Sequence, residues 1–163
     1  MVNMGVDINF NPSYFKKLGL KVNGYEKPID RAVDHGLHET EVTMKKEVPR
    51  PGHGRGKNYK PTGNLQRSIS KRKIGACQGV IISSLKNPAY WVYVQYGTMP
   101  HKIKAKPGKF LVFENEKGEI IRVKEVNHPG MPANPFITRT KNKVLPKFNE
   151  FFIEEFKKEG ILD

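Results

Sequence analysis

Five histidines are the side chains of this chain with the most versatile chemistry, and two of them share a helical spacing. His35 and His38 stand three residues apart, and acids lie beside them at Asp34, Glu39 and Glu41. Imidazole and carboxylate groups are ligands that zinc accepts. The HExxH pattern is missing, however, as is every paired Cys or His spacing, so the sequence favours a solvated helix face over a metal site.

A second pair of histidines, His101 and His128, flanks a predicted hairpin and could meet in space. Paired imidazoles serve acid–base chemistry, as in a small basic nuclease whose lysines hold phosphates. The sequence lacks the carboxylate cluster that would hold the metal ion of such an enzyme. We therefore favour histidines that hydrogen-bond the backbone at the ends of the hairpin, and we expect no catalytic residues, no metal and no cofactor.

The stretch from Arg50 to Pro61 contains Gly, Pro and basic residues and superficially resembles a phosphate-binding loop. Pro51 stands where that pattern requires its first Gly, and Asn58 follows the lysine in place of Ser or Thr. A segment of this composition buries little surface. It is predicted to be a mobile basic loop.

The positive charge of the chain is concentrated in two stretches. Residues 45–73 hold ten Lys and Arg residues against one acid, Glu47, and residues 101–109 hold four lysines and no acid. These stretches contribute +9 and +4 and so account for the whole formal charge of +13. The remainder of the chain is balanced, which predicts a neutral packed body that carries two basic loops.

Three roles stay open for these basic stretches. They are solvated, as charge runs usually are, or they bind nucleic acid through its phosphates, or they meet acidic surfaces of protein partners. The side chains that would contact a partner or DNA are Arg50, Arg55, Lys57, Lys60, Lys102, Lys104, Lys106 and Lys109.

A length of 163 residues suits one packed core, and an aromatic content of 10% argues against wholesale disorder. The single cysteine, Cys77, excludes an internal disulfide and is expected to be a small buried residue. No apolar run approaches the roughly 20 residues of a membrane span. The N-terminus also lacks a leader pattern, so we expect a soluble protein made in the cytosol.

Residue periodicity predicts helices and strands in alternation. Residues 1–25 form an edge strand or a docking arm, and residues 26–163 form a single domain. The first helix is expected from Pro28 to Val48. It is followed by a short helix over 62–69 capped by Thr62, strands over 71–74 and 80–85, and a helix over 88–96 that begins after an Asn87-Pro88 cap and ends at Gly97.

The second half of the chain is predicted to contain a hairpin and a long helix. Strands over 110–113 and 119–126 are joined by a turn at 115–118. The last helix begins at Pro135, and Pro146 is expected to kink or split it. The exposed side of the 88–96 helix cannot hold all of its aromatics, so several are expected to pack inward or on another subunit. The fold class is α+β, with a small, mainly antiparallel sheet covered by an N-terminal and a long C-terminal helix and with extended basic loops.

Three motifs follow one another along the chain: TGNLQRSI from Thr62, YWVYVQYGTMPHKIKAKPGKFLVF from Tyr90, and HPGMPANPF from His128. In this order and spacing, over residues 26–158, they resemble the neck, or head–tail joining, proteins of long-tailed bacteriophages, also known as tail-completion proteins. The positions that match most clearly are Thr62, Gly63, Leu65, Tyr96, Gly97, Thr98, His128, Pro129, Gly130 and Phe136.

This resemblance implies a structural virion protein without enzymatic activity. Such proteins form rings between the head portal and the tail tube, stack on connector or tail-terminator rings, and surround the passing genomic DNA. The loops 50–61 and 100–109 would contact adjacent rings or that DNA. The alternative from another class is a basic nucleic-acid-binding protein or small nuclease, which would bind duplex DNA tightly and with a steep salt dependence.

Overall fold

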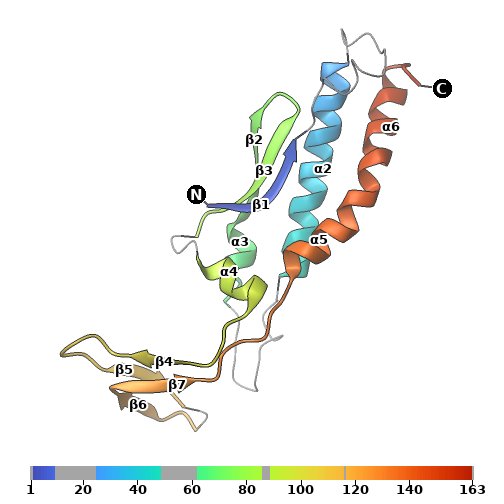
Figure 1. The fold of residues 1–163 in the computed structure, drawn as a ribbon. Coiled ribbons are helices and arrows are strands. Elements are labelled where there is room, and N and C mark those ends of the chain that lie inside the picture. Colours follow the sequence, from blue (N-terminus) through green and yellow to red (C-terminus); the bar gives the residue numbers. More distant parts are fainter. Residues whose placement is uncertain (1, 10–24, 49–61, 86–88, 116, 163) are drawn as a thin grey trace.

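The computed structural model describes residues 2–9, 25–48, 62–85, 89–115 and 117–162 (Figure 1). Helices and small antiparallel sheets alternate along the chain, which confirms the predicted α+β class. The basic loop 50–61, the Asn87-Pro88 cap and residues 10–24 lie outside the described residues.

Helix α2 (Glu26–Glu47) forms the centre of the body, as the periodicity predicted. Its apolar positions Ile29, Val33, Leu37 and Met44 are almost completely buried. These positions recur every three or four residues and therefore lie toward the packed side of the helix. Glu26 in the first turn and two lysines in the last turn complement the helix dipole.

A three-stranded antiparallel sheet covers one side of α2. Strands β1 (Val2–Asn9), β2 (Ile69–Gly75) and β3 (Gln78–Ser83) lie in the order β1-β3-β2. The expected edge strand is therefore confirmed for residues 2–9, and the predicted β2–β3 hairpin is confirmed as well.

The turn of the β2–β3 hairpin brings Cys77 against the start of α2. Cys77 is buried, as predicted, and its backbone has a left-handed φ of 58°. Its N–H donates a hydrogen bond of 3.0 Å to the Asp30 carboxylate. Burial raises the pKa of the Cys77 thiol, and the nearby carboxylate of Asp30 adds to this effect. The backbone N–H of Cys77 thus links the hairpin to the helix, and its side chain packs as a small apolar group.

The C-terminal helices cover the other side of α2, so the body has three layers (Figure 1). Helix α5 (Phe136–Val144) is followed by the 3-10 turn η1 (Leu145–Lys147) and helix α6 (Phe148–Lys158). Pro146 lies in η1, which confirms the predicted split. Phe136, Val144 and Phe151 fill the layer between these helices and α2.

Two short helices complete the body. In α3 (Asn64–Ser68) the N-cap is Gly63 with a left-handed φ of 71°, so the predicted cap at Thr62 was one residue too early. The Thr62 hydroxyl still accepts a long hydrogen bond of 3.4 Å from the Asn64 N–H. Helix α4 (Ala89–Tyr96) ends at Gly97, whose φ of 75° confirms the predicted terminator.

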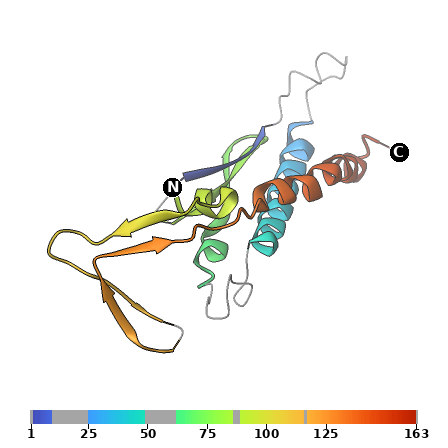
Figure 2. The ribbon, with the colours of Figure 1, turned by 60° about the horizontal axis from the view of Figure 1, so that its bottom comes forward.

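The segment after Gly97 leaves the body as two successive two-stranded ribbons with a bend between them (Figures 1 and 2). Strands β4 (His101–Lys104) and β7 (Glu125–His128) form the inner ribbon, and β5 (Leu111–Glu114) and β6 (Ile120–Val123) form the outer one. The predicted basic loop 100–109 was wrong in its first half, which is β4. The predicted strand 119–126 is broken at Lys124, because the chain bends there to pair with β4.

Gly79 sets the distance between the sheet and α2. A Cβ atom at this position would lie 2.1 Å from Cδ1 of Leu37, a side chain that is fully buried. Substitution Gly79→Ala should lower the free energy of unfolding by about 1–3 kcal/mol, because the core is overpacked. Chemical denaturation measures this loss.

Gly75 is the matched control for that substitution. It lies in the same hairpin, and a Cβ there would approach no atom more closely than 3.6 Å, from Gln78 Oε1. Gly75→Ala should leave stability nearly unchanged. Equal losses from the two variants would show that close packing of Gly79 on α2 does not limit stability.

Candidate functional site

The strongest candidate for a functional site is the projecting segment 98–131, called the arm below (Figure 2). Its base is closed by an isolated antiparallel bridge between Thr98 and Met131. The Thr98 N–H donates to the Met131 carbonyl and the Met131 N–H donates to the Thr98 carbonyl, both at 2.8 Å. This pair of backbone hydrogen bonds is where the arm leaves the body.

Two glycines make this bridge possible. Gly97 and Gly130 have φ angles of 75° and 82°. A Cβ on Gly97 would lie 2.3 Å from the Met131 carbonyl oxygen, and a Cβ on Gly130 would lie 2.3 Å from the Thr98 carbonyl oxygen. Each glycine thus has the other strand's backbone against its Cα, and only a residue without a side chain fits.

The histidines expected to meet in space do so at the inner ribbon. His101 and His128 are directly opposed in the β4–β7 register, with ring centroids 5.0 Å apart. Nδ1 of His128 accepts a hydrogen bond of 3.0 Å from the Gly130 N–H, and Nδ1 of His101 lies 2.9 Å from the Met99 carbonyl oxygen. Each ring thus engages the backbone beside it, as the sequence suggested, and shapes the base of the arm.

Most of the motif residues in the second half of the chain gather at this base. Gly97, Thr98, His128 and Gly130 surround the bridge, and Pro129 continues the same turn. Sequence reasoning missed Met131, the partner of Thr98. Only its position directly after the HPG turn could have pointed to it.

The remaining motif residues lie elsewhere. Leu65 and Phe136 are buried in the core of the body. Thr62 and Gly63 begin α3, and Tyr96 is 71% exposed at the end of α4. These residues support the body and do not form part of the arm.

Large apolar side chains of the arm face solvent. Met99 is 82% exposed and Ile120 is 62% exposed, and four further apolar side chains of the arm are exposed as well: Ile103, Phe110, Val112 and Phe113. The described strands of the arm pair only in twos, so among the described residues neither ribbon has a further strand to widen it. Several large apolar side chains exposed on one projecting segment are typical of a binding surface.

The arm also carries cations that have few partners. Lys102, Lys104, Lys106 and Lys109 are all exposed. Ten ion pairs join described residues, and the arm contains only one of them, a 3.4 Å contact between Lys102 and Glu125. An exposed pair of this length contributes little. Many acids of the body pair with its own cations, whereas most lysines of the arm have no ion-pair partner among the described residues.

Helix α4 extends this exposed surface toward the body. Tyr90, Tyr93 and Tyr96 recur every three residues and are all exposed, while Trp91 packs partly against the core. Most of the α4 aromatics therefore do not pack inward within the chain. Gln95 also attaches α4 to the start of α5, because its Oε1 accepts a hydrogen bond of 3.0 Å from the Ile137 N–H.

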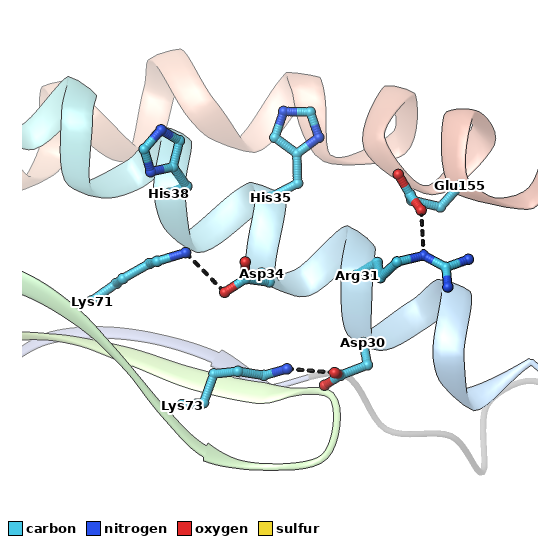
Figure 3. A pocket seen from close by; sticks show the side chains of 8 residues that line it. All are labelled: Asp30, Arg31, Asp34, His35, His38, Lys71, Lys73 and Glu155. Carbon is cyan, nitrogen blue, oxygen red and sulfur yellow. Dashed lines mark hydrogen bonds and ion pairs between the residues drawn. The ribbon is translucent and has the colours of Figure 1, made fainter. Parts of the chain in front are cut away.

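A second candidate is an open hollow of about 620 Å³ between α2, β2 and α6 (Figure 3). His35 and His38, the residues weighed as zinc ligands, line it. Among the described residues no group of three or more metal-ligating side chains comes together. His35 stacks on Phe151 instead, with ring centroids 4.3 Å apart.

The charged side chains of the hollow pair with one another across the layers (Figure 3). Lys71 bridges to Asp34 at 2.9 Å, Lys73 pairs with Asp30, and Arg31 reaches the buried Glu155 at 2.7 Å. These contacts tie β2 and α6 to the two sides of α2. The hollow is therefore a structural network of the body.

The carboxylates of this network are held in their charged form. The pKa of Asp30 is lowered by its hydrogen bond from Lys73 and then by the backbone N–H of Cys77. The pKa of Glu155 is lowered by Lys158 and then by Arg31. In both cases hydrogen bonds to the charged form outweigh the effect of burial. The charged side chains of this network thus form ion pairs with one another.

The structure separates the two groups of predicted basic contacts. Lys102, Lys104, Lys106 and Lys109 lie together on the arm. Arg50, Arg55, Lys57 and Lys60 fall outside the described residues, so their prediction stays untested. In the described part of the chain, no helix is both long and apolar enough to cross a membrane.

Substitution Gly130→Ala should open the base of the arm. The new Cβ would collide with a backbone oxygen that cannot move without breaking the Thr98–Met131 bridge. Hydrogen exchange should show lost protection at the Thr98 and Met131 amides, while the amides of α2 stay protected.

Gly108 provides the control for this substitution. Its φ of 73° is equally left-handed, yet a Cβ there would meet no atom within 4 Å. Gly108→Ala carries the same backbone penalty of about 1–2 kcal/mol and should leave both amides protected. If Gly130→Ala also left them protected, the bridge would not depend on the glycine.

The charged side chains that line the hollow are thus paired within the chain, whereas most lysines of the arm are not. Comparison of the chain with protein-family models, with curated proteins and with solved structures found no match. The function must therefore be argued from the arm itself.

Proposed function

We propose that the protein is a structural subunit of the neck of a long-tailed bacteriophage, where it forms a ring that joins the head portal or connector to the tail tube. It is made in the host cytoplasm, becomes part of the virion and acts without catalysis. Its neighbours are further copies of itself and other neck, connector and tail-terminator or tail-tube proteins. The genomic DNA passes through the ring and makes at most nonspecific contacts.

The arm is the observation that carries this proposal. An isolated two-stranded ribbon is marginally stable in water, and here both ribbons also expose large apolar side chains. A neighbouring subunit that covers the arm would bury these apolar side chains and stabilise the ribbons. An element that becomes fully stable only against a neighbour is what an assembling ring requires.

The contrast between arm and body adds support. The charges around the hollow are paired within the chain, which suits a scaffold. The motif residues that carry the resemblance to neck proteins include those that close the arm's base, Gly97, Thr98 and Gly130. Part of the motif that resembles neck proteins thus forms the base from which the arm projects.

The alternative, a nucleic-acid-binding protein or small nuclease, draws on the same lysines. Phosphates would satisfy their charge but would offer nothing to Met99, Phe110 or Ile120, which are more than half exposed. A protein surface satisfies both kinds of side chain. The mixture of apolar and basic side chains on one arm therefore favours a protein partner.

Reversal of the four arm lysines, K102E, K104E, K106E and K109E together, should block head–tail joining. The side chains are exposed, so the subunit should still fold, with an unchanged circular dichroism spectrum and melting temperature. In the encoding phage, loss of the gene should yield separate heads and tails. The natural gene supplied in trans should restore infectious particles, and the reversed gene should not.

The control reverses exposed lysines of the body, K27E, K46E and K141E, and should complement normally. Normal infectious particles from the arm variant would contradict the proposal. Nanomolar binding of duplex DNA with a steep salt dependence, or any cleavage, would support the alternative instead.

A further inference from the structure

The outer side of α6 offers a surface that complements the arm. Glu150 and Glu154 are exposed and lie one turn apart on the same side of the helix. Ile153, between them, is 46% exposed. Neither glutamate forms an ion pair with another described residue, although most acids of the body do. Lys157 lies on this side as well, and Lys147 and Lys158, which flank it, pair with Glu39 and Glu155.

The spacing of the charges on the two surfaces matches. Lys102 and Lys104 project from the same face of β4, because side chains alternate along a strand, and they lie about 6.6 Å apart. Glu150 and Glu154 are separated by one helical turn, so their Cβ atoms are about 5–6 Å apart. Two lysines can therefore meet two glutamates at once. Asn127 and Glu125, the residues opposite Lys102 and Lys104, share this face of the inner ribbon, whereas Ile103 lies on the other face.

The shape of the molecule prevents the arm from reaching this surface within one chain. Both views place the arm and α6 at opposite ends of the body (Figures 1 and 2). A contact between the two must therefore join different copies. Because each copy carries one arm and one α6, the contact uses two different surfaces and repeats in one direction. Such heterologous contacts form rings when the rotation closes.

We infer that the arm of one subunit docks on the outer side of α6 of a second copy, with Lys102 and Lys104 facing Glu150 and Glu154. This inference rests on the proposed function for the closure of the ring, and it names the surface that covers the arm.

A charge exchange between two variants of the full chain tests this contact. One variant carries K102E and K104E, and the other carries E150K and E154K. Each alone places like charges at every contact, so its self-association should weaken about tenfold or more. An equimolar mixture should associate again, because each arm then meets an oppositely charged α6. Light scattering over a concentration series measures the mass in all three samples.

A substitution at Lys157 provides a control, because it changes the charge of the α6 surface in the opposite direction to E150K and E154K. Substitution K157E makes the α6 surface more acidic and should leave association unchanged or strengthen it, without affecting folding. A natural chain that stays monomeric at every concentration would overturn the inference. So would a mixture that remains as dissociated as its components.

The outcomes also separate this inference from the proposed function. If the arm lysines are needed for head–tail joining but the α6 glutamates are not, the arm docks on a different protein and the neck assignment stands. If the mixture reassociates while arm variants still yield normal virions, the contact exists and the neck assignment fails.

Discussion

The two backbone hydrogen bonds between Thr98 and Met131 are the interaction on which the arrangement of this molecule depends. They bring together chain segments that leave α4 and return to α5, and they let everything between them project as one arm. The bridge exists only because Gly97 and Gly130 allow the two backbones to approach. A local constraint on two residues thus sets the place where the arm leaves the body.

The body provides a stable support for that arm. Helix α2 is covered by a sheet on one side and by α5 and α6 on the other, and ion pairs such as Arg31–Glu155 connect the layers. Gln95 anchors α4 to the start of α5, directly beside the base of the arm. The position of the arm is therefore set by elements with buried contacts, although the arm itself has few.

The sequence predicted best what depends on local patterns. Apolar periodicity placed α2, the Pro residues placed the start of α5 and its break at Pro146, and Gly97 marked the end of α4. It predicted poorly what depends on pairing between distant residues. The assignment of β4 as a loop and the single strand over 119–126 failed because the β4–β7 pairing joins residues over twenty positions apart. The partnership of Thr98 with Met131 was missed for the same reason.

We propose that the exposed arm joins this subunit to its neighbours in a phage neck. The most direct measurement is negative-stain imaging and light scattering of the purified chain, alone and after mixing with particles of the encoding phage. We expect a ring, or added density at the portal vertex or at the end of the tail. A monomer that ignores the particles and instead binds or cuts duplex DNA would contradict it.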